Sequence, residues 1–387
     1  MKKRILWFLL ICISLLTACG SPAQSGGAPG ELSDLPYTYP DGSIAPEDGE
    51  SGYIPVNFTG QHGIWLPYMD FENYMYRKSE EEFRAAAKEL LEEASENGVN
   101  TVYFHVHPNG DAYYDSEIFP RGVYYDGDYD PLAIMTEIAH SMGISLHAWI
   151  NPLRLQTEEQ MSRLEDNFVV KKWIDEGSPN VRLVDGRWYL NPAYDEVIDL
   201  VSETVGEILD KYQVDGIHID DYFYPTQEAD FDSEAFESSG ESDLSAWRRN
   251  NVNRMVRAIY DTVKKHGGRL KFGISPQGNV DTDVNKLYAD VKLWCREDGY
   301  ADYIVPQIYY GFRNEVCPFE STLHRWEELC KDSDISLIIG LAGYKVGEKD
   351  KWAGESGENE WIEDPDVLKK QIELVEESSA SGYAVYY

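Results

Sequence analysis

Residues 214–225 read Val-Asp-Gly-Ile-His-Ile-Asp-Asp-Tyr-Phe-Tyr-Pro, and this stretch bears on both the fold and the site. Apolar and polar positions alternate through it, with Ile217 and Ile219 on one face and His218 and Asp220 on the other. Alternation with a period of two is typical of a β-strand that packs one face into a core. The pattern predicts a strand over 214–220, with Asp220 at its C-terminal tip.

Seven other short runs resemble this one, and long helical segments separate them. The eight predicted strands are 62–66, 100–106, 144–150, 214–220, 270–275, 303–308, 336–341 and 382–387. Regular alternation of strands and helices implies parallel strands with right-handed crossovers, and eight such units close a barrel. We therefore predict an α/β fold, a (β/α)₈ TIM barrel. A doubly wound open sheet is the alternative, but no G-x-G-x-x-G or P-loop follows the first strand.

Capping residues predict where several helices begin. Ser79 and Glu82 have the spacing of a capping box, and Asp130 followed by a proline is typical of a helix start. The pair at 191–192, Asn followed by Pro, predicts a third start of the same kind. The segment 284–297 is predicted to form one helix.

Polar side chains are predicted to line one interior wall of the barrel, because alternate strand residues point inward. The second strand contributes Tyr103, His105 and His107, while the third contributes His147, Trp149 and Asn151. A purely structural barrel core prefers branched aliphatic residues at such positions. The polar wall therefore indicates a functional site at the C-terminal ends of these strands.

Glycoside hydrolysis usually needs two carboxyl groups, and the sequence offers three candidates near the predicted mouth. Asp220 is the first, as nucleophile or base, because barrel enzymes keep catalytic groups at strand tips. Asp111 follows the second strand and is the candidate partner. Asp221 is adjacent to Asp220, so its side chain should diverge and anchor the loop instead.

Several neighbouring residues have side chains suited to holding a sugar. His147 and His218 are predicted to hydrogen-bond the sugar or to orient Asp220, and Asn151 and Arg154 to hold hydroxyl or carboxylate groups. The remaining candidates are the aromatic platforms Trp149, Tyr222, Tyr224 and Tyr309, and Gln307 at the tip of the sixth strand.

Five motifs together resemble the glycosyl-hydrolase-like 10 family, a group of bacterial, often lipoprotein, barrel proteins. They are residues 214–225, Pro-Asn-Gly-Asp-Ala at 108–112, His-Ala-Trp-Ile-Asn-Pro at 147–152, Ile-Ser-Pro at 274–276 and Asp-Tyr-Ile-Val-Pro-Gln-Ile-Tyr at 302–309. The resemblance covers residues 60–387 and implies a metal-free hydrolase of bacterial glycans, including peptidoglycan. The family usually has Arg where this chain has His107, so His107 joins the candidates for substrate binding.

The N-terminal residues have the features of a secretory targeting signal. Lys2, Lys3 and Arg4 precede an apolar run that is too short to span a bilayer. The Leu-Thr-Ala-Cys that follows, at 16–19, resembles a bacterial lipobox, which implies lipidation of Cys19. We therefore predict a lipoprotein signal peptide over 1–18, a flexible tether over 19–57 and the barrel over 58–387. These imply a cell-membrane location, lipid-anchored and facing the extracytoplasmic side.

Composition narrows the range of partners. The net charge of −35 makes a nucleic-acid backbone an improbable partner. A neutral polysaccharide or oligosaccharide would not be repelled, and 27 Tyr and 10 Trp supply flat faces for sugar rings. No cofactor motif is present. Cys295, Cys317 and Cys330 lack C-x-x-C spacing, and their pairing stays open.

Two other functions fit parts of the pattern. A metal-dependent hydrolase would use the histidine cluster of His105, His107, His147 and His218, since such clusters can bind zinc. A non-catalytic glycan-binding lipoprotein would be a hydrolase scaffold that has lost its activity. Retention of Asp220 in a complete motif argues against the second of these.

Overall fold

The computed structural model describes residues 53–387, which form one closed barrel of eight parallel strands in the order β1-β11-β10-β9-β8-β7-β3-β2. The strands are β1 (Gln61–Leu66), β2 (Thr101–His107), β3 (Ser145–Ile150), β7 (Gly216–Ile219), β8 (Lys271–Ile274), β9 (Tyr303–Ile304), β10 (Ser336–Ala342) and β11 (Gly382–Tyr386). All eight predicted strands are confirmed, and with them the TIM barrel.

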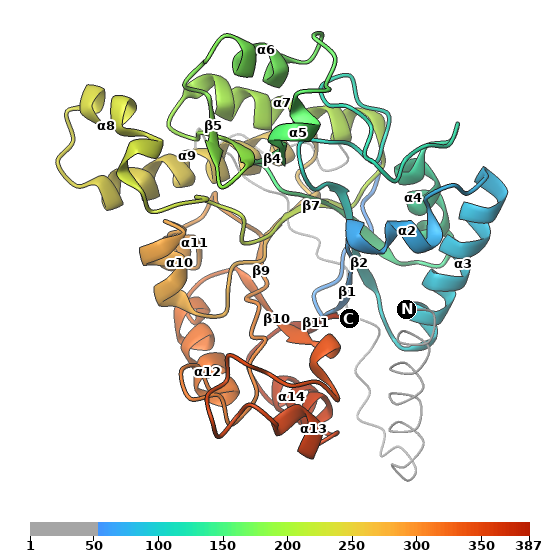
Figure 1. Ribbon diagram of the computed structural model, residues 1–387. Helices are drawn as coiled ribbons and strands as arrows, with labels where there is room; N and C mark the ends of the chain where they lie inside the picture. Colours follow the sequence, from blue (N-terminus) through green and yellow to red (C-terminus); the bar gives the residue numbers. More distant parts are fainter. Residues whose placement is uncertain (1–52) are drawn as a thin grey trace.

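Helices surround the barrel (Figure 1). They are α2 (Phe71–Tyr74), α3 (Glu80–Glu96), α4 (Pro131–Ser141), α5 (Glu158–Met161), α6 (Val169–Asp175), α7 (Asp195–Lys211), α8 (Ser233–Ser239), α9 (Leu244–His266), α10 (Val280–Lys286), α11 (Val291–Trp294), α12 (Phe319–Cys330), α13 (Glu360–Glu363) and α14 (Val367–Glu376). Short 3₁₀ turns are η1 (Tyr68–Asp70), η2 (Ala229–Phe231) and η3 (Gly343–Lys345). Among the described residues, no helix is long and apolar enough to cross a membrane.

The capping predictions are partly confirmed. The side chain of Ser79 accepts from the backbone N–H of Glu82 in a complete capping box, and Asp130 caps α4 through the backbone N–H of Ala133. The predicted start at 191–192 is wrong, because the backbone N–H of Asn191 donates to Asn180 and α7 begins at 195. The predicted helix over 284–297 is also wrong, since the chain forms two short helices there, α10 and α11.

An antiparallel sheet that the sequence analysis missed lies between β3 and β7 in the chain. It consists of β4 (Arg154–Thr157), β6 (Arg187–Leu190) and β5 (Val181–Val184), in that spatial order. Figure 1 shows β4 and β5 beside α5 and α6, apart from the barrel strands. This insertion brings Arg154 and Arg187 to neighbouring strands.

The predicted inward and outward faces of the strands are confirmed except at His107, where an irregularity in the β2–β3 register sets the residue opposite the outward-facing Ile150. The interior cluster consists of Trp65, Tyr103, Trp149, Tyr303, Val305, Ile338 and Ala384, whereas the outward-facing Ile217 and Ile219 join the larger core beneath the helices. Aromatic rings thus fill an interior in which branched aliphatic side chains usually predominate. Gly273 makes room for one of them, since a Cβ there would lie 1.9 Å from the Tyr303 ring.

The first described residues close the N-terminal end of the barrel. The side chain of Asn57 donates to the backbone carbonyls of Asp215 and Arg269, which precede β7 and β8, at 2.9 and 3.3 Å. The hydroxyl of Tyr53 donates to the Asp215 carboxylate at 2.5 Å. Residues 53–57 therefore pack on the barrel, while the remainder of the predicted tether and Cys19 lie outside the described residues.

The three cysteines of the described chain are free thiols. Cys295 and Cys330 are buried in the same core, and a hydrogen bond with Cys330 is the first cause of the raised pKa of Cys295, followed by burial. Cys317 is less buried. The structure therefore places Cys295 and Cys330 next to one another.

Candidate active site

Asp220 directly follows β7, at the C-terminal end of the barrel, which we call the mouth. Asp220 is 5% exposed, and one of its carboxylate oxygens accepts from the backbone N–H of Tyr222 at 3.2 Å. The β7 register sets His218 beside Trp149 of β3. The indole N–H of Trp149 favours the ionised form of Asp220 but makes no hydrogen bond of good geometry.

The side chain of Asp221 turns to a different set of partners. Its two oxygens accept from the amide groups of Gln277 at 3.0 Å and Gln307 at 3.4 Å. These glutamines follow β8 and β9, so Asp221 ties three strand ends together. Gln307 also donates to the backbone carbonyl of Ser275 at 3.0 Å. This geometry matches the anchoring role expected of Asp221. The Gln307 side chain, predicted to bind substrate, takes part in the same anchoring contacts.

Burial controls the electrostatics of both carboxyl groups. Burial is the main cause that raises the pKa of Asp220 well above its ordinary value, and the neighbouring charge of Asp221 raises it further. Burial also raises the pKa of Asp221, although the amides of Gln277 and Gln307 oppose this shift. Strongly perturbed carboxyl groups in a concave site are candidates for acid or base chemistry.

Asp111 lies in the loop that follows β2, and its own hydrogen bonds fix it there. Its carboxylate accepts from the backbone N–H of Asn109 at 2.9 Å, and the ring of His107 bonds its backbone carbonyl at 2.9 Å. Burial raises the pKa of Asp111 to about 7, while the positive charges of Arg187 and Arg154 lower it. A pKa of about 7 suits Asp111 to proton transfer near neutral pH.

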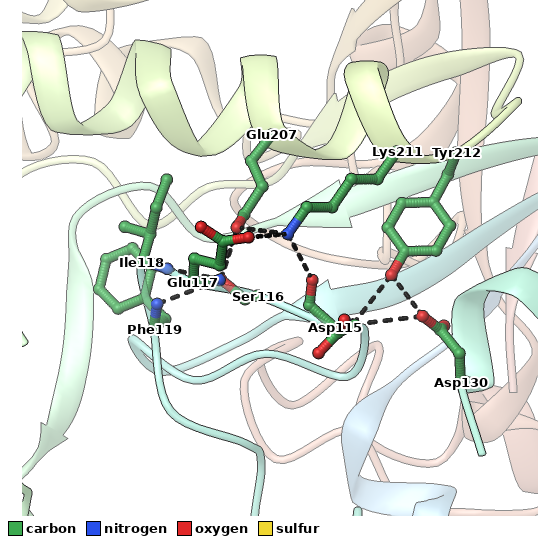
Figure 2. Close-up of polar contacts among 9 residues, drawn as sticks. All are labelled: Asp115, Ser116, Glu117, Ile118, Phe119, Asp130, Glu207, Lys211 and Tyr212. Atoms are coloured by element: carbon green, nitrogen blue, oxygen red, sulfur yellow. Dashed lines mark hydrogen bonds and ion pairs between the residues drawn. The ribbon is translucent and has the colours of Figure 1, made fainter.

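The same loop is held from outside by α7, as Figure 2 shows. The Glu207 carboxylate accepts from the Ser116 hydroxyl and from the backbone N–H of Glu117, both at 2.6 Å. Lys211 donates to the backbone carbonyl of Asp115 at 3.0 Å, and Tyr212 joins Asp115 to Asp130. Phe119 follows in this loop and packs against the His107 ring at 4.4 Å between centroids. The helix thus helps to position His107 and Asp111.

Four side chains near the mouth have buried polar atoms that make no hydrogen bond of good geometry. His105 stacks on Trp149 with ring centroids 3.5 Å apart, and its Nε2 atom lies 3.2 Å from the Asn151 amide oxygen. The unpartnered atoms are His105 Nδ1, Trp149 Nε1, Asn151 Nδ2 and Arg154 Nε. Buried polar groups are normally hydrogen-bonded, so this gathering of free groups indicates a place for a polar ligand.

Two arginines near the mouth have no ion-pair partner among the described residues. The guanidinium of Arg154 lies over the Tyr222 ring at 4.4 Å, and Arg187 donates to Asn109 and to the Leu155 carbonyl at 3.0 and 2.6 Å. Burial lowers the pKa of Arg187, and the charge of Arg154 lowers it further. The two cations therefore repel each other, and the acidic groups near them, Asp111, Asp220 and Asp221, interact with Arg154 at longer range without forming an ion pair.

Three predicted substrate-binding residues lie away from the mouth. His147 and His218 are fully buried inside the barrel, and all four of their ring nitrogens bond to protein groups. Tyr224 is buried against Phe231 and Tyr288 in the outer core. These side chains can support the site, but their partners leave no polar ring atom of either histidine free for a sugar hydroxyl.

The other aromatic candidates lie nearer the mouth. Tyr222 is 42% exposed, and Tyr309 is half-buried between the rings of Tyr344 and Tyr386, with centroids at 6.0 and 6.2 Å. Arg187, Tyr344 and Tyr386 also lie near the mouth but were not predicted from the sequence. Arg187 lies in the unpredicted sheet, and no residue pattern linked that segment to the mouth.

The geometry does not fit the metal-dependent alternative. Within residues 53–387, no three His, Cys, Asp or Glu side chains are arranged to hold a metal ion. His147 and His218 use both ring nitrogens for protein hydrogen bonds, and His107 uses Nδ1 for a backbone carbonyl. The histidine cluster of the sequence therefore does not converge on one point.

The closed parallel barrel, with carboxyl groups at its C-terminal mouth, is the architecture of TIM-barrel glycoside hydrolases. The chain matches the Glycosyl hydrolase-like 10 family over residues 61–356. It therefore belongs to this family, and it is a glycoside hydrolase with a carbohydrate substrate.

Two relatives share much of the chain. It is 29% identical to the glycosyl hydrolase DigH of Escherichia coli K12 over 392 residues, covering 89% of this chain and 86% of the relative. It is 32% identical to the glycosyl hydrolase YngK of Bacillus subtilis 168 over 319 residues, covering 75% of this chain and 61% of the relative.

Solved structures share the fold at low sequence identity. The PgaB glycoside hydrolase domain of Bordetella bronchiseptica has a TM-score of 0.56 and 11% identity, covering 84% of this chain and 93% of that one. The α-L-fucosidase isoenzyme 2 of Paenibacillus thiaminolyticus has a TM-score of 0.54 and 13% identity, covering 84% of this chain and 46% of that one. These likenesses support the barrel assignment alone.

The raised pKa of Asp111 predicts a pH-dependent effect of Asp111→Asn on stability. Between the ordinary pKa of 3.8 and about 7, the folded protein holds a proton that the unfolded chain has released. The contribution of Asp111 to stability therefore falls as pH rises through this window. The neutral amide has no such loss, so Asp111→Asn should gain stability relative to wild type from pH 5 to pH 8. Urea unfolding at both pH values measures this, and an equal difference at the two would contradict the shift.

Proposed function

We propose that this glycoside hydrolase cleaves the glycan strands of peptidoglycan on the extracytoplasmic side of the membrane, with Asp220 as a catalytic group. The observation that carries the assignment is the position of Asp220, at a strand tip beside buried polar groups that have no protein partner. Such groups can bond the hydroxyl and amide groups of a sugar. The non-catalytic alternative would leave the perturbed carboxyl groups without a role.

The two carboxyl groups of the reaction are Asp220 and Asp111 in this proposal. Burial and the charge of Asp221 raise the pKa of Asp220 well above its ordinary value, so in this proposal Asp220 holds a proton and donates it to the leaving oxygen. Asp111, with a pKa of about 7 and two arginines nearby, supplies the carboxylate. It either activates water or attacks the anomeric carbon. These roles reverse the sequence-based assignment, because burial and the neighbouring charge of Asp221 both favour the protonated form of Asp220.

The unpaired arginines favour a substrate that carries its own negative charge. Arg154 and Arg187 lie near Asp111 in a chain whose net charge is −35, yet no acidic side chain in the described part of the chain pairs with either. A planar guanidinium is suited to bind a carboxylate through two parallel hydrogen bonds. Muramic acid in peptidoglycan carries a lactyl carboxylate, which is free once the peptide is removed. This chemistry supports a peptide-free glycan strand as substrate.

The location rests on Cys19 and the residues before it. We propose that lipid on Cys19 holds the enzyme at the outer side of the cytoplasmic membrane, since acyl chains can anchor a protein without a spanning helix. The Cys19→Ser variant should then move from the membrane fraction to the soluble fraction of cells, without loss of activity. Persistence of the variant in washed membranes would contradict the anchor.

Loss of the proton donor should affect substrates according to their leaving group. We expect Asp220→Asn to reduce cleavage of peptide-free glycan strands by about 10²–10⁴-fold, the usual contribution of general acid catalysis. Aryl glycosides whose leaving group departs without a proton should lose much less. New reducing ends measure the first reaction, and release of the phenol measures the second.

Asp221→Asn is the matched control for that experiment, because it changes a neighbouring carboxyl group that anchors loops. It should lower activity on both substrate types together. Equal background release of reducing ends by wild type and Asp220→Asn would show that this chain is not a hydrolase of these strands. Binding of strands without cleavage would then favour the glycan-binding alternative.

The carboxylate hypothesis predicts a link between one arginine and one substrate group. Arg187→Gln should raise KM for carboxylated strands by about tenfold, as expected for a lost charged hydrogen bond. Strands whose carboxylates have been amidated should bind wild type weakly, and the variant should show no further loss with them. Arg187→Lys, which keeps the charge, is the control. Equal effects of Arg187→Gln on both strands would contradict the contact.

A further inference from the structure

Trp352 is the most exposed large apolar side chain among the described residues, at 88%, and the proposed chemistry leaves it unused. It lies in the loop between η3 and α13, which follows β10 and so belongs to the mouth end of the barrel (Figure 1). Val316, at 76%, is the next most exposed and lies in the neighbouring loop, between β9 and α12. Exposed apolar side chains that gather at one place usually mark an interaction site.

Hydrogen bonds bring the two loops together. The backbone N–H of Glu315 donates to the carbonyl of Ala353 at 2.9 Å, directly between the positions of Val316 and Trp352. The Glu315 carboxylate then accepts from the backbone and the hydroxyl of Ser356 at 3.1 and 2.8 Å. The two loops are therefore cross-linked one residue away from both Val316 and Trp352.

A buried ion pair fixes the Trp352 loop to the mouth. Asp350 accepts from the backbone N–H of Trp352 at 3.2 Å and pairs with Lys345 at 2.7 Å. The ammonium of Lys345 also donates to the backbone carbonyl of Tyr309 at 2.6 Å. A loop held in this way can present an aromatic ring with little loss of conformational freedom on binding.

Aromatic rings continue from this anchor towards the proposed catalytic group. Tyr309 contacts Tyr344 and Tyr386, with centroids at 6.0 and 6.2 Å, and Tyr386 contacts Trp65 at 6.2 Å. Electrostatic interaction with ionised Asp220, the form left after it has donated its proton, is among the causes that raise the pKa of Tyr386, after burial and Asp70, so this ring lies near Asp220. An aromatic path thus leads from Asp220 to the Trp352 loop.

We propose that Trp352 and Val316 form a remote sugar-binding site, which holds a pyranose unit of the same glycan strand away from the bond that is cleaved. The proposal rests on the proposed function and extends it to polymeric substrates. The flat indole can pack on the apolar face of a sugar ring. Nearby charges are mixed, as in the ion pair of Lys349 with Glu358 at 3.4 Å, so the surface suits an uncharged sugar face.

The test compares long strands with short substrates in the full-length chain. Trp352→Ala should lower kcat/KM on long strands about tenfold, the size of one aromatic contact. It should leave kcat/KM unchanged on a disaccharide glycoside that reaches only the mouth. Trp352→Phe should restore most of the loss on long strands, and Leu183→Ala, another exposed apolar residue, should change neither substrate.

Binding by an inactive protein separates this inference from the proposed function. Asp220→Asn and Asp220→Asn with Trp352→Ala are compared for cosedimentation with insoluble glycan strands, which requires no cleavage. Weaker binding of the double variant supports the remote site even where wild type shows no hydrolysis. Equal binding and equal kcat/KM on long strands overturn it. Loss of binding to anionic lipid vesicles alone also overturns it, because Trp352 would then contact a membrane.

Discussion

One tyrosine hydroxyl, that of Tyr303, joins the hydrogen bonds at the centre of the barrel. The Asn57 amide oxygen only accepts, so the Nε2 atom of His147 carries a proton and its Nδ1 atom accepts from Tyr303 at 2.7 Å. The Tyr303 oxygen accepts in turn from His218 at 3.1 Å, which leaves the other nitrogen of His218 to accept from Trp65 at 3.2 Å. Burial lowers the pKa of both histidines, so the network is neutral. An aromatic interior can therefore hold polar groups whose hydrogen bonds are satisfied by one another.

Two aspartates at opposite ends of β7 differ in how fully protein donors satisfy their carboxylate oxygens. Asp215, at the closed end, is fully buried and accepts from four donors, those of Tyr53, Val56, His140 and Leu146. Asp220, at the mouth, accepts one backbone hydrogen bond and lies beside polar groups that remain free. Buried carboxylates are stabilised by donors that bond their charge, so Asp215 fixes the barrel, whereas Asp220 keeps capacity for another ligand.

The barrel was predictable because its signal is local: strands alternate with a period of two, and capping residues mark α3 and α4. The depth of a side chain within the barrel is not local. His147 and Asp220 both face inward, yet the register sets His147 beside Gly216, near the closed end, where a Cβ on Gly216 would lie 2.8 Å from its ring. The small sheet was missed because its strands are four residues long and their pairing depends on the loop they pack against.

The cations near the mouth lack the ion-pair partners that buried cations have elsewhere in the described chain. Acidic residues outnumber basic ones by 69 to 34, and buried cations elsewhere have acidic partners, as Arg248 has in Asp232 at 2.6 Å. Arg154 and Arg187 lack such partners while their charges favour ionised Asp111. An acidic side chain between them would satisfy both guanidinium groups but would also raise the pKa of Asp111. Under the proposed function, leaving that position to the substrate keeps the Asp111 carboxylate available and couples the binding of an anionic sugar to its ionisation.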